Sequence, residues 1–237
     1  MITLYGRKPV QEVLRDPSIR VYKLHLAETN RTSDVIAEIR SLAESRDIDI
    51  QMHTREALSR ISKNGRQDQG VAIDIQPMHY GHINGLPEEV TELIVVDGVT
   101  NPQNLGMIIR SVTASPVHGL LIPKKGSAKI DPLVHKASAG TLLKGNLYHA
   151  PTIESGLEAL KTKGFTLIGL AGSSDILLQD TAATDKIAFV VGNETEGLSE
   201  GALKRCDQLA RIPLANDVES INVAMAATLV SFRSLLT

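Results

Sequence analysis

The carboxy-terminal stretch, from Ile187 onward, constrains the fold more than any other part of the chain. It begins with IAFVVG, a continuous apolar run that ends in glycine, as buried parallel strands do. The polar turn GNETEGLS follows, and the run from Leu209 to Leu214 predicts a second strand. Ser220 then occupies the position of a helix N-cap before a run of small apolar residues. Together these elements predict a crevice at the carboxyl ends of the strands, where open α/β sheets bind ligands.

Strand and helix patterns alternate along the rest of the chain, which predicts an α/β fold. In residues 92–237 the strand-like runs ELIVVD, HGLLIP, LYHA and FTLIGLAG are separated by helical patterns, so we expect a mostly parallel sheet. Residues 1–78 repeat the alternation on a smaller scale and predict a small α/β domain. Residues 79–91, which begin HYGHINGLPEEV, hold two glycines, a proline and few apolar positions, so we expect a linker there.

Composition excludes several classes of protein. The 42% of hydrophobic residues can form a core, yet no apolar run approaches the roughly 18 residues of a membrane span. The start of the chain, MITLYGRKPV, has no signal-peptide pattern, so we expect a cytoplasmic protein without a membrane partner. The single cysteine, Cys206, excludes an internal disulfide and a cysteine metal cluster, and we expect no metal.

Positive charge is concentrated in two short stretches, although the net charge is −2. Five lysines lie between Lys124 and Lys144 against one acid, Asp131, and RISKNGR adds three cations without an acid. Both stretches contain glycine and fall outside helix faces, which favours contact with nucleic-acid phosphates over an ordinary solvated loop. The residues predicted to bind RNA are Arg60, Lys63, Arg66, Lys124, Lys125 and Lys129.

Three motifs, in matching order and spacing, give the chain a family resemblance. DGVTNPQNLGMIIRSV (Asp97–Val112), GNETEGLS and IPLANDVESINVAMAA resemble the three motifs of the SpoU family of RNA 2′-O-ribose methyltransferases. The similarity continues through Ser138-Ala139-Gly140 and covers nearly the whole chain. Residues 1–78 are similar to the ribosomal-protein-like RNA-binding domain that precedes the catalytic domain in many of these enzymes.

The resemblance implies an activity and a cofactor site. It implies methyl transfer from S-adenosylmethionine to a ribose 2′-hydroxyl, in a domain that contains a deep trefoil knot. The implied cofactor-binding residues are Gly192, Asn193, Ile212, Leu214, Ser220 and Asn222. Those implied at the acceptor are Asn104, Arg110, Glu194, Ser220 and Asn222. Because an arginine stays protonated in proteins, we expect Arg110 to hold a phosphate and align the hydroxyl. The helix expected from Asn222 to Leu236 is apolar on several sides, and the resemblance implies that it forms a homodimer.

A few positions depart from the family pattern. Asn101, Met107 and Val112 replace residues that are more often Asp, Ala and Ala, and none of these changes removes a polar group of the motif. Asp68 stands where histidine is usual, ahead of Gln-Gly-Val, and weakens the expectation that this loop contacts RNA in the family's way.

The sequence is compatible with more than one RNA substrate and more than one class of protein. Methylation of 23S-type rRNA is favoured by the front RNA-binding domain, with a tRNA ribose methyltransferase as the near alternative. An antibiotic-resistance methylase of the same architecture is another possibility. A non-catalytic ribosome-assembly protein is disfavoured by the intact polar residues of the motifs. A nucleotide-dependent oxidoreductase is disfavoured because this chain has no glycine fingerprint after its first strand.

Overall fold

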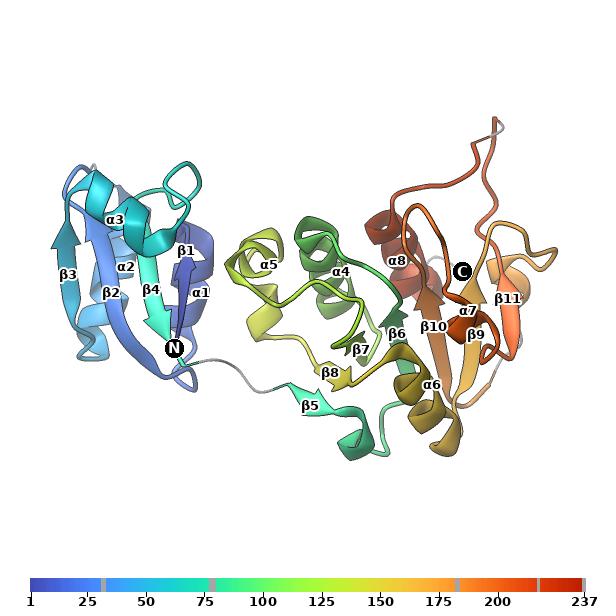
Figure 1. The fold of residues 1–237 in the computed structure, drawn as a ribbon. Coiled ribbons are helices and arrows are strands. Elements are labelled where there is room, and N and C mark those ends of the chain that lie inside the picture. The colour runs from blue at the N-terminus through green and yellow to red at the C-terminus, as the bar shows by residue number, and fades with distance from the viewer. Residues whose placement is uncertain (31–32, 77–79, 182–183, 217, 236–237) are drawn as a thin grey trace. The chain divides into compact units, whose positions relative to one another are not determined.

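The computed structural model describes residues 1–30, 33–76, 80–181, 184–216 and 218–235. The chain divides into two compact units (Figure 1). Unit 1 comprises residues 1–79 together with 130–143, and unit 2 comprises residues 80–129 and 144–237. The segment 130–143 therefore clusters with unit 1, although in sequence it lies inside the range expected for the larger domain.

Unit 1 is built on a mixed four-stranded sheet. Its strands are β1 (Ile2–Tyr5), β2 (Val21–Ala27), β3 (Ile50–His53) and β4 (Val71–Ile75), in the order β1-β4-β2-β3. β4 runs antiparallel to both of its neighbours, and β2 is parallel to β3. Its helices are α1 (Arg7–Arg15), α2 (Asp34–Ser45), α3 (Arg55–Ser62) and α5 (Pro132–Ala137), with a 3-10 turn at η2 (Thr141–Leu143). The sequence pattern did not predict β1, because four residues are too few to establish a period of two.

Unit 2 contains a seven-stranded sheet in which every observed pairing is parallel, which confirms the predicted mostly parallel sheet. Its strands are β5 (Gly81–His82), β6 (Glu92–Val96), β7 (Gly119–Pro123), β8 (Leu147–Ala150), β9 (Thr166–Leu170), β10 (Ile187–Val191) and β11 (Gln208–Ala210). Their order is β11-β9-β10-β6-β7-β8-β5. The prediction for the last strand was wrong in extent: β11 ends at Ala210, and the run to Leu214 continues as loop.

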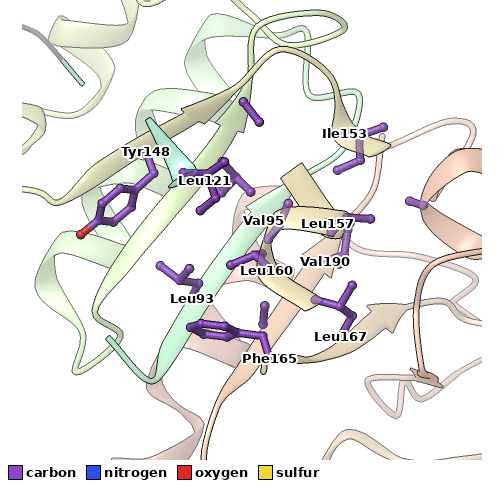
Figure 2. Close-up of a cluster of buried hydrophobic side chains, with 14 of the residues drawn as sticks. Leu93, Val95, Leu121, Tyr148, Ile153, Leu157, Leu160, Phe165, Leu167 and Val190 are labelled. Carbon is purple, nitrogen blue, oxygen red and sulfur yellow. The ribbon is translucent and has the colours of Figure 1, made fainter. Parts of the chain in front are cut away.

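Helices cover both faces of this sheet. They are α4 (Pro102–Ala114), α6 (Ile153–Thr162), α7 (Glu200–Leu203) and α8 (Val223–Phe232), with 3-10 turns η1 (Ile83–Gly85), η3 (Leu178–Asp180) and η4 (Arg233–Leu235). α4 and α8 pack against each other (Figure 1). Figure 2 shows the core beside α6, where Leu157 and Leu160 meet Leu93 and Val95 of the central strand. Phe189 points to the opposite face, where the Arg233 guanidinium lies 4.2 Å from its ring centroid.

Residues 81–90, within the stretch expected to be a linker, contribute to the core of unit 2. Ile83, Leu86 and Val90 are each at most 5% exposed and belong to the cluster around α6. Three apolar residues at intervals of three and four were enough for burial, although turn-forming residues surround them. Among the described residues, no helix is both long and apolar enough to cross a membrane.

Candidate functional site

The direction in which the chain adds strands to the sheet of unit 2 reverses at β6. From β6 the chain extends the sheet through β7 and β8, and later returns to place β10 and β9 on the other side of β6. Such a switch point leaves a crevice at the carboxyl ends of the strands, because the loops there leave in opposite directions. The loops that follow β6, β9, β10 and β11 meet at this edge.

A cavity of about 500 Å³ lies at this edge and confirms the predicted crevice. Of the residues expected to bind the cofactor or acceptor, Gly192, Asn193, Glu194, Ile212, Leu214 and Ser220 line it. Asn104, Arg110 and Asn222 are not among the lining residues. The other residues in its wall come from the ends of β9 and β10 and the loops that follow them, from α7 and α8, and from the loop between β11 and α8.

The turn after β10 is held by its own backbone and by the half-buried side-chain amide of Asn193. A Cβ at position 192 would lie 2.5 Å from the Leu198 nitrogen and closer still to Gly197, so Gly192 is required by the folding of the turn itself. The Asn193 amide donates to Gly98 O (2.8 Å), and its oxygen accepts from Thr195 N (2.8 Å). The turn is thereby fixed to the loop that follows β6.

A chain of side-chain hydrogen bonds joins the three motifs. The Asn104 amide donates to Glu194 Oε1, and Asn104 Oδ1 accepts from Asn222 Nδ2 (3.1 Å). Asn222 Oδ1 in turn accepts from Ala224 N (2.8 Å) at the start of α8. Each amide is oriented by a partner on both sides. The carboxylate of Glu194, at the cavity wall, is therefore positioned by residues that are distant in sequence.

The helix cap before α8 differs from the sequence prediction. Asn222, rather than Ser220, is the N-cap, and Ser220 is an exposed residue in the wall of the cavity. Both asparagine and serine suit an N-cap, so the pattern alone could not choose between positions two residues apart. Ser220 is left available to a ligand.

Arg110 and Asn104 lie on different faces of α4. Asn104 is buried and faces Glu194 and Asn222, whereas Arg110, six residues on, is exposed. Arg110 forms no hydrogen bond or ion pair with any residue that the structure describes, and its neighbour Met107 is 41% exposed. Within one chain, Arg110 is thus open to an external anion and does not reach into the cavity wall.

The lysine-rich stretch of unit 2 is a loop tied to the first motif. Lys124, Lys125 and Lys129 are exposed, and Ala128 N donates to Val99 O (2.8 Å) in the loop after β6. Because backbone bonds hold the loop, these lysines are presented to solvent close to the strand ends that form the site.

In unit 1 the predicted basic residues also face solvent. Arg60, Lys63 and Arg66 are exposed and without hydrogen-bond or ion-pair partners in the described part of the chain. Several other cations of this unit are paired with carboxylates: Lys8 with Glu12, Arg15 with Glu38, Lys23 with Asp49 and Arg55 with Asp68. Positive charge is therefore left uncompensated along the α3–β4 connection.

Asp68 is a structural residue of that connection. It is fully buried and accepts hydrogen bonds from Ser62 Oγ (2.9 Å) and Gly70 N (2.9 Å), while Arg55 lies 2.9 Å away. A buried carboxylate with three partners organises the loop and cannot contact RNA directly. The departure from the family's histidine therefore changes how the loop is built.

The segment 130–143 supports the same loop. Lys136 Nζ donates to Gln67 O (2.9 Å) and lies 5.9 Å from the Tyr5 ring centroid, so this lysine serves unit 1 internally. Burial lowers the pKa of Lys136, and the Asp68 carboxylate opposes that shift. The neighbouring His135 is 3% exposed, and burial lowers its pKa to about 4.

Sequence reasoning missed part of the cavity wall. Arg211, Glu219 and the residues 171–173 after β9 line the cavity and were not predicted to. The position of 171–173 at the carboxyl end of a strand was a usable signal. Arg211 stands directly before the third motif, but no local pattern distinguishes a cavity arginine from a surface one.

Comparisons with known proteins identify the family. A model described as the SpoU rRNA Methylase family matches residues 92–232, and one described as RNA 2′-O ribose methyltransferase substrate binding matches residues 3–81. A protein of Mycobacterium leprae, described as an uncharacterized tRNA/rRNA methyltransferase, is 34% identical over 96% of this chain and 75% of its own length. The chain belongs to the SpoU family. The resemblance found in its three motifs is thus confirmed.

Solved structures show the same fold over the full length. The SpoU methyltransferase AviRb from Streptomyces viridochromogenes, in complex with the cofactor AdoMet, superposes with a TM-score of 0.82 at 23% identity. That match covers 99% of this chain and 90% of AviRb. An AdoMet-bound rRNA methyltransferase from Sinorhizobium meliloti gives a TM-score of 0.80 at 19% identity, covering 100% of this chain and 88% of the other.

Proposed function

We propose that this SpoU-family protein transfers a methyl group from S-adenosylmethionine to a ribose 2′-hydroxyl of RNA, with 23S rRNA as the favoured substrate. Family membership supports RNA methylation. The observation that carries the proposal is the hydrogen-bond chain Glu194–Asn104–Asn222, which unites all three motifs beside the cavity. A protein that only bound RNA would have no evident need for this constellation.

The cavity fits the donor in size and charge. Its volume of about 500 Å³ falls within the range of roughly 300–1,000 Å³ usual for small-molecule sites. Glu194, Glu196 and Glu219 line it, and carboxylates suit a ligand that carries sulfonium and ammonium charges. When bound, S-adenosylmethionine supplies a methyl group on a good leaving group, so the transfer needs no metal.

The residues of this chain would bind and align the acceptor. Ser220, exposed in the cavity wall, can hydrogen-bond to the ribose, and the chain through Asn104 and Asn222 keeps Glu194 in place. Arg110 is free to hold a backbone phosphate and so orient the 2′-hydroxyl. Because its guanidinium stays protonated, the hydroxyl proton passes to water or a phosphate oxygen.

RNA would be held by the two sets of uncompensated cations. Lys124, Lys125 and Lys129 present positive charge near the site, and Arg60, Lys63 and Arg66 do so on unit 1. Phosphate contacts of this kind give affinity without sequence specificity. A cytoplasmic location, where ribosomal RNA is modified, belongs to the same proposal, as does the trefoil knot of the cofactor-binding region.

We also propose that the protein is a homodimer. α8 buries Val223, Ala227 and Val230 within its own chain but leaves Met225 62% and Leu229 43% exposed. These two residues lie one turn apart on a helix that packs against α4, which carries the exposed Met107. A monomeric mass in solution at micromolar concentration would contradict the dimer.

Methyl transfer from labelled donor to separated rRNA and tRNA pools tests the activity. We expect labelled 23S rRNA, with the label in a 2′-O-methylated nucleoside after digestion. Label confined to tRNA would establish the alternative substrate. Donor binding without labelling of either pool would favour a ribosome-assembly protein instead.

The Arg110→Ala variant tests the assignment of the acceptor side. Because Arg110 lies outside the cavity wall, we expect methyl transfer to fall by at least about a hundredfold, while donor affinity stays within about tenfold. Donor affinity is measured by calorimetry and transfer with the RNA pool that the wild type labels. A loss of donor binding, or of folding, would contradict this role.

A further inference from the structure

Arg211 is held at the edge of the cavity by its own backbone. Its N–H donates to Ile176 O (2.8 Å), and its carbonyl accepts from Leu178 N (2.8 Å). Leu177 and Arg211 thus form an isolated parallel bridge just beyond β11. The position of Arg211 is set by these bonds and does not depend on a partner for its side chain.

Within the described ranges the guanidinium of Arg211 has no counter-charge, although three glutamates line the same cavity. Arg211 is half-buried, and no residue in the described ranges makes a hydrogen bond or ion pair with its side chain. Elsewhere in unit 2, Arg205 is paired with Glu158 and Arg233 with Glu92. An arginine left without a partner in a cavity wall is available to an anionic group of a ligand.

The charged residues of the wall complement one ligand in particular. Arg211 is the one cationic side chain among the described residues that line the cavity, and it shares the wall with Glu194, Glu196 and Glu219. S-adenosylmethionine carries two positive centres, the sulfonium and the α-ammonium, and one negative centre, the α-carboxylate. The cavity presents carboxylates for the sulfonium and the α-ammonium, and a single guanidinium for the α-carboxylate.

We propose that Arg211 binds the α-carboxylate of the donor's methionine portion, an inference that rests on the proposed function. A guanidinium matches a carboxylate with two parallel N–H···O bonds, which gives both strength and orientation. Arg211 would thus make the cavity selective for donors with an intact amino-acid carboxylate. It would also fix the end of the donor opposite the adenine, and so the line along which the methyl group points.

Calorimetric titration with two donors that differ only in this group tests the proposal. The ligands are S-adenosylmethionine and decarboxylated S-adenosylmethionine, and the proteins are the wild type and Arg211→Met, which keeps the length and removes the charge. We expect Arg211→Met to weaken S-adenosylmethionine about tenfold to a hundredfold and to leave the decarboxylated donor within about twofold. Arg205→Met removes a cation paired outside the cavity and should change neither affinity.

The outcomes separate this assignment from the activity itself. If Arg211→Met lost affinity equally for both donors, or for neither, the role of Arg211 would be overturned. Weaker RNA binding by Arg211→Met with unchanged donor affinity would also overturn this role, because the anion that Arg211 binds would then be an RNA phosphate. A wild type that binds neither donor contradicts the proposed function instead. If Arg211→Met does not fold, the wild type alone tests the proposal. We expect the wild type to bind decarboxylated S-adenosylmethionine at least about tenfold more weakly than S-adenosylmethionine. Equal affinities for the two donors would overturn the proposal.

Discussion

Two glycine-containing loops, one in each unit, are built alike and carry opposite charge. Residues 62–70 in unit 1 are held by the buried carboxylate of Asp68, and residues 192–199 in unit 2 by the amide of Asn193. The first carries the exposed cations Lys63 and Arg66, and the second carries Glu194 and Glu196 at the cavity. Internal polar residues fix the shape of each loop, which leaves the outward residues to select the ligand.

The difference between the loops matches two ligands of opposite charge. A polyanion such as RNA is attracted by cations that have no internal partner. A donor with positive centres is attracted by carboxylates in a cavity wall. The comparison predicts that changes to the internal residues alter stability, whereas changes to the outward residues alter binding alone.

Removal of the Asp68 carboxylate is expected to have the largest effect. Asp68→Ala leaves Gly70 N without an acceptor, Ser62 Oγ with only its longer bond to Ser59 O (3.4 Å) and Arg55 without its counter-charge. We therefore expect a loss of about 3–4 kcal/mol in the free energy of unfolding, measured in urea. Asp49→Ala is the control: it removes an exposed carboxylate 3.6 Å from Lys23 and should change the free energy of unfolding by less than about 0.5 kcal/mol. Similar losses in the two variants would contradict the structural role of Asp68.

Acid should weaken unit 1 through His135, next to the lysine that supports its loop. Burial lowers the pKa of His135 to about 4 in the folded chain, whereas it titrates near 6.5 when unfolded. Between these values the unfolded chain binds more protons, so stability falls as pH drops from about 6.5 to 4, by up to about 3 kcal/mol. Unfolding of the wild type and His135→Leu at pH 7 and pH 5 measures this contribution, and an unchanged pH dependence in the variant would refute it.

Gly192→Ala should damage the loop of unit 2 from within. The added Cβ would overlap the backbone of Gly197 and Leu198, which no side-chain rotation relieves. We expect a loss of about 2 kcal/mol in stability and at least a tenfold loss in donor affinity by calorimetry. Gly85→Ala, where nothing lies within 4 Å of the added atom, is the matched control and should affect neither. Wild-type donor affinity in Gly192→Ala would show that the turn tolerates rearrangement.

The outward cations of unit 1 should affect binding without affecting stability. Replacing Arg60, Lys63 and Arg66 together by Gln should weaken RNA binding about tenfold at 0.15 M salt and lower the slope of log K against log salt by about 2. The unfolding free energy and donor affinity should stay unchanged. Replacing the paired cations Lys8, Arg15 and Lys23 removes equal charge and should have a smaller effect on RNA. Equal losses in the two triple variants would mean that net charge alone matters.

Much of the site could be predicted from the sequence because each motif is local. The run IAFVV becomes a fully buried strand, and the turn that begins at Gly192 lies at the cavity as predicted. Other predictions were wrong where two local solutions were equally good: the cap of α8 is Asn222, and β11 ends at Ala210. Adjacent positions with similar propensities differ only in what they meet in the folded chain.

The sequence by itself determined the family, the parallel sheet and six of the residues that line the cavity, since hydrophobic period and motif spacing are properties of the chain. Tertiary structure alone decided which polar groups have partners. It buries Asp68, directs Lys136 Nζ to Gln67 O and leaves Arg110 in solvent. It also places Arg211 beside the cavity without a side-chain partner among the residues that the structure describes. The reason is that hydrogen bonds and ion pairs act over a few ångströms between segments far apart in sequence. Strand order, and not local pattern, brings those segments together.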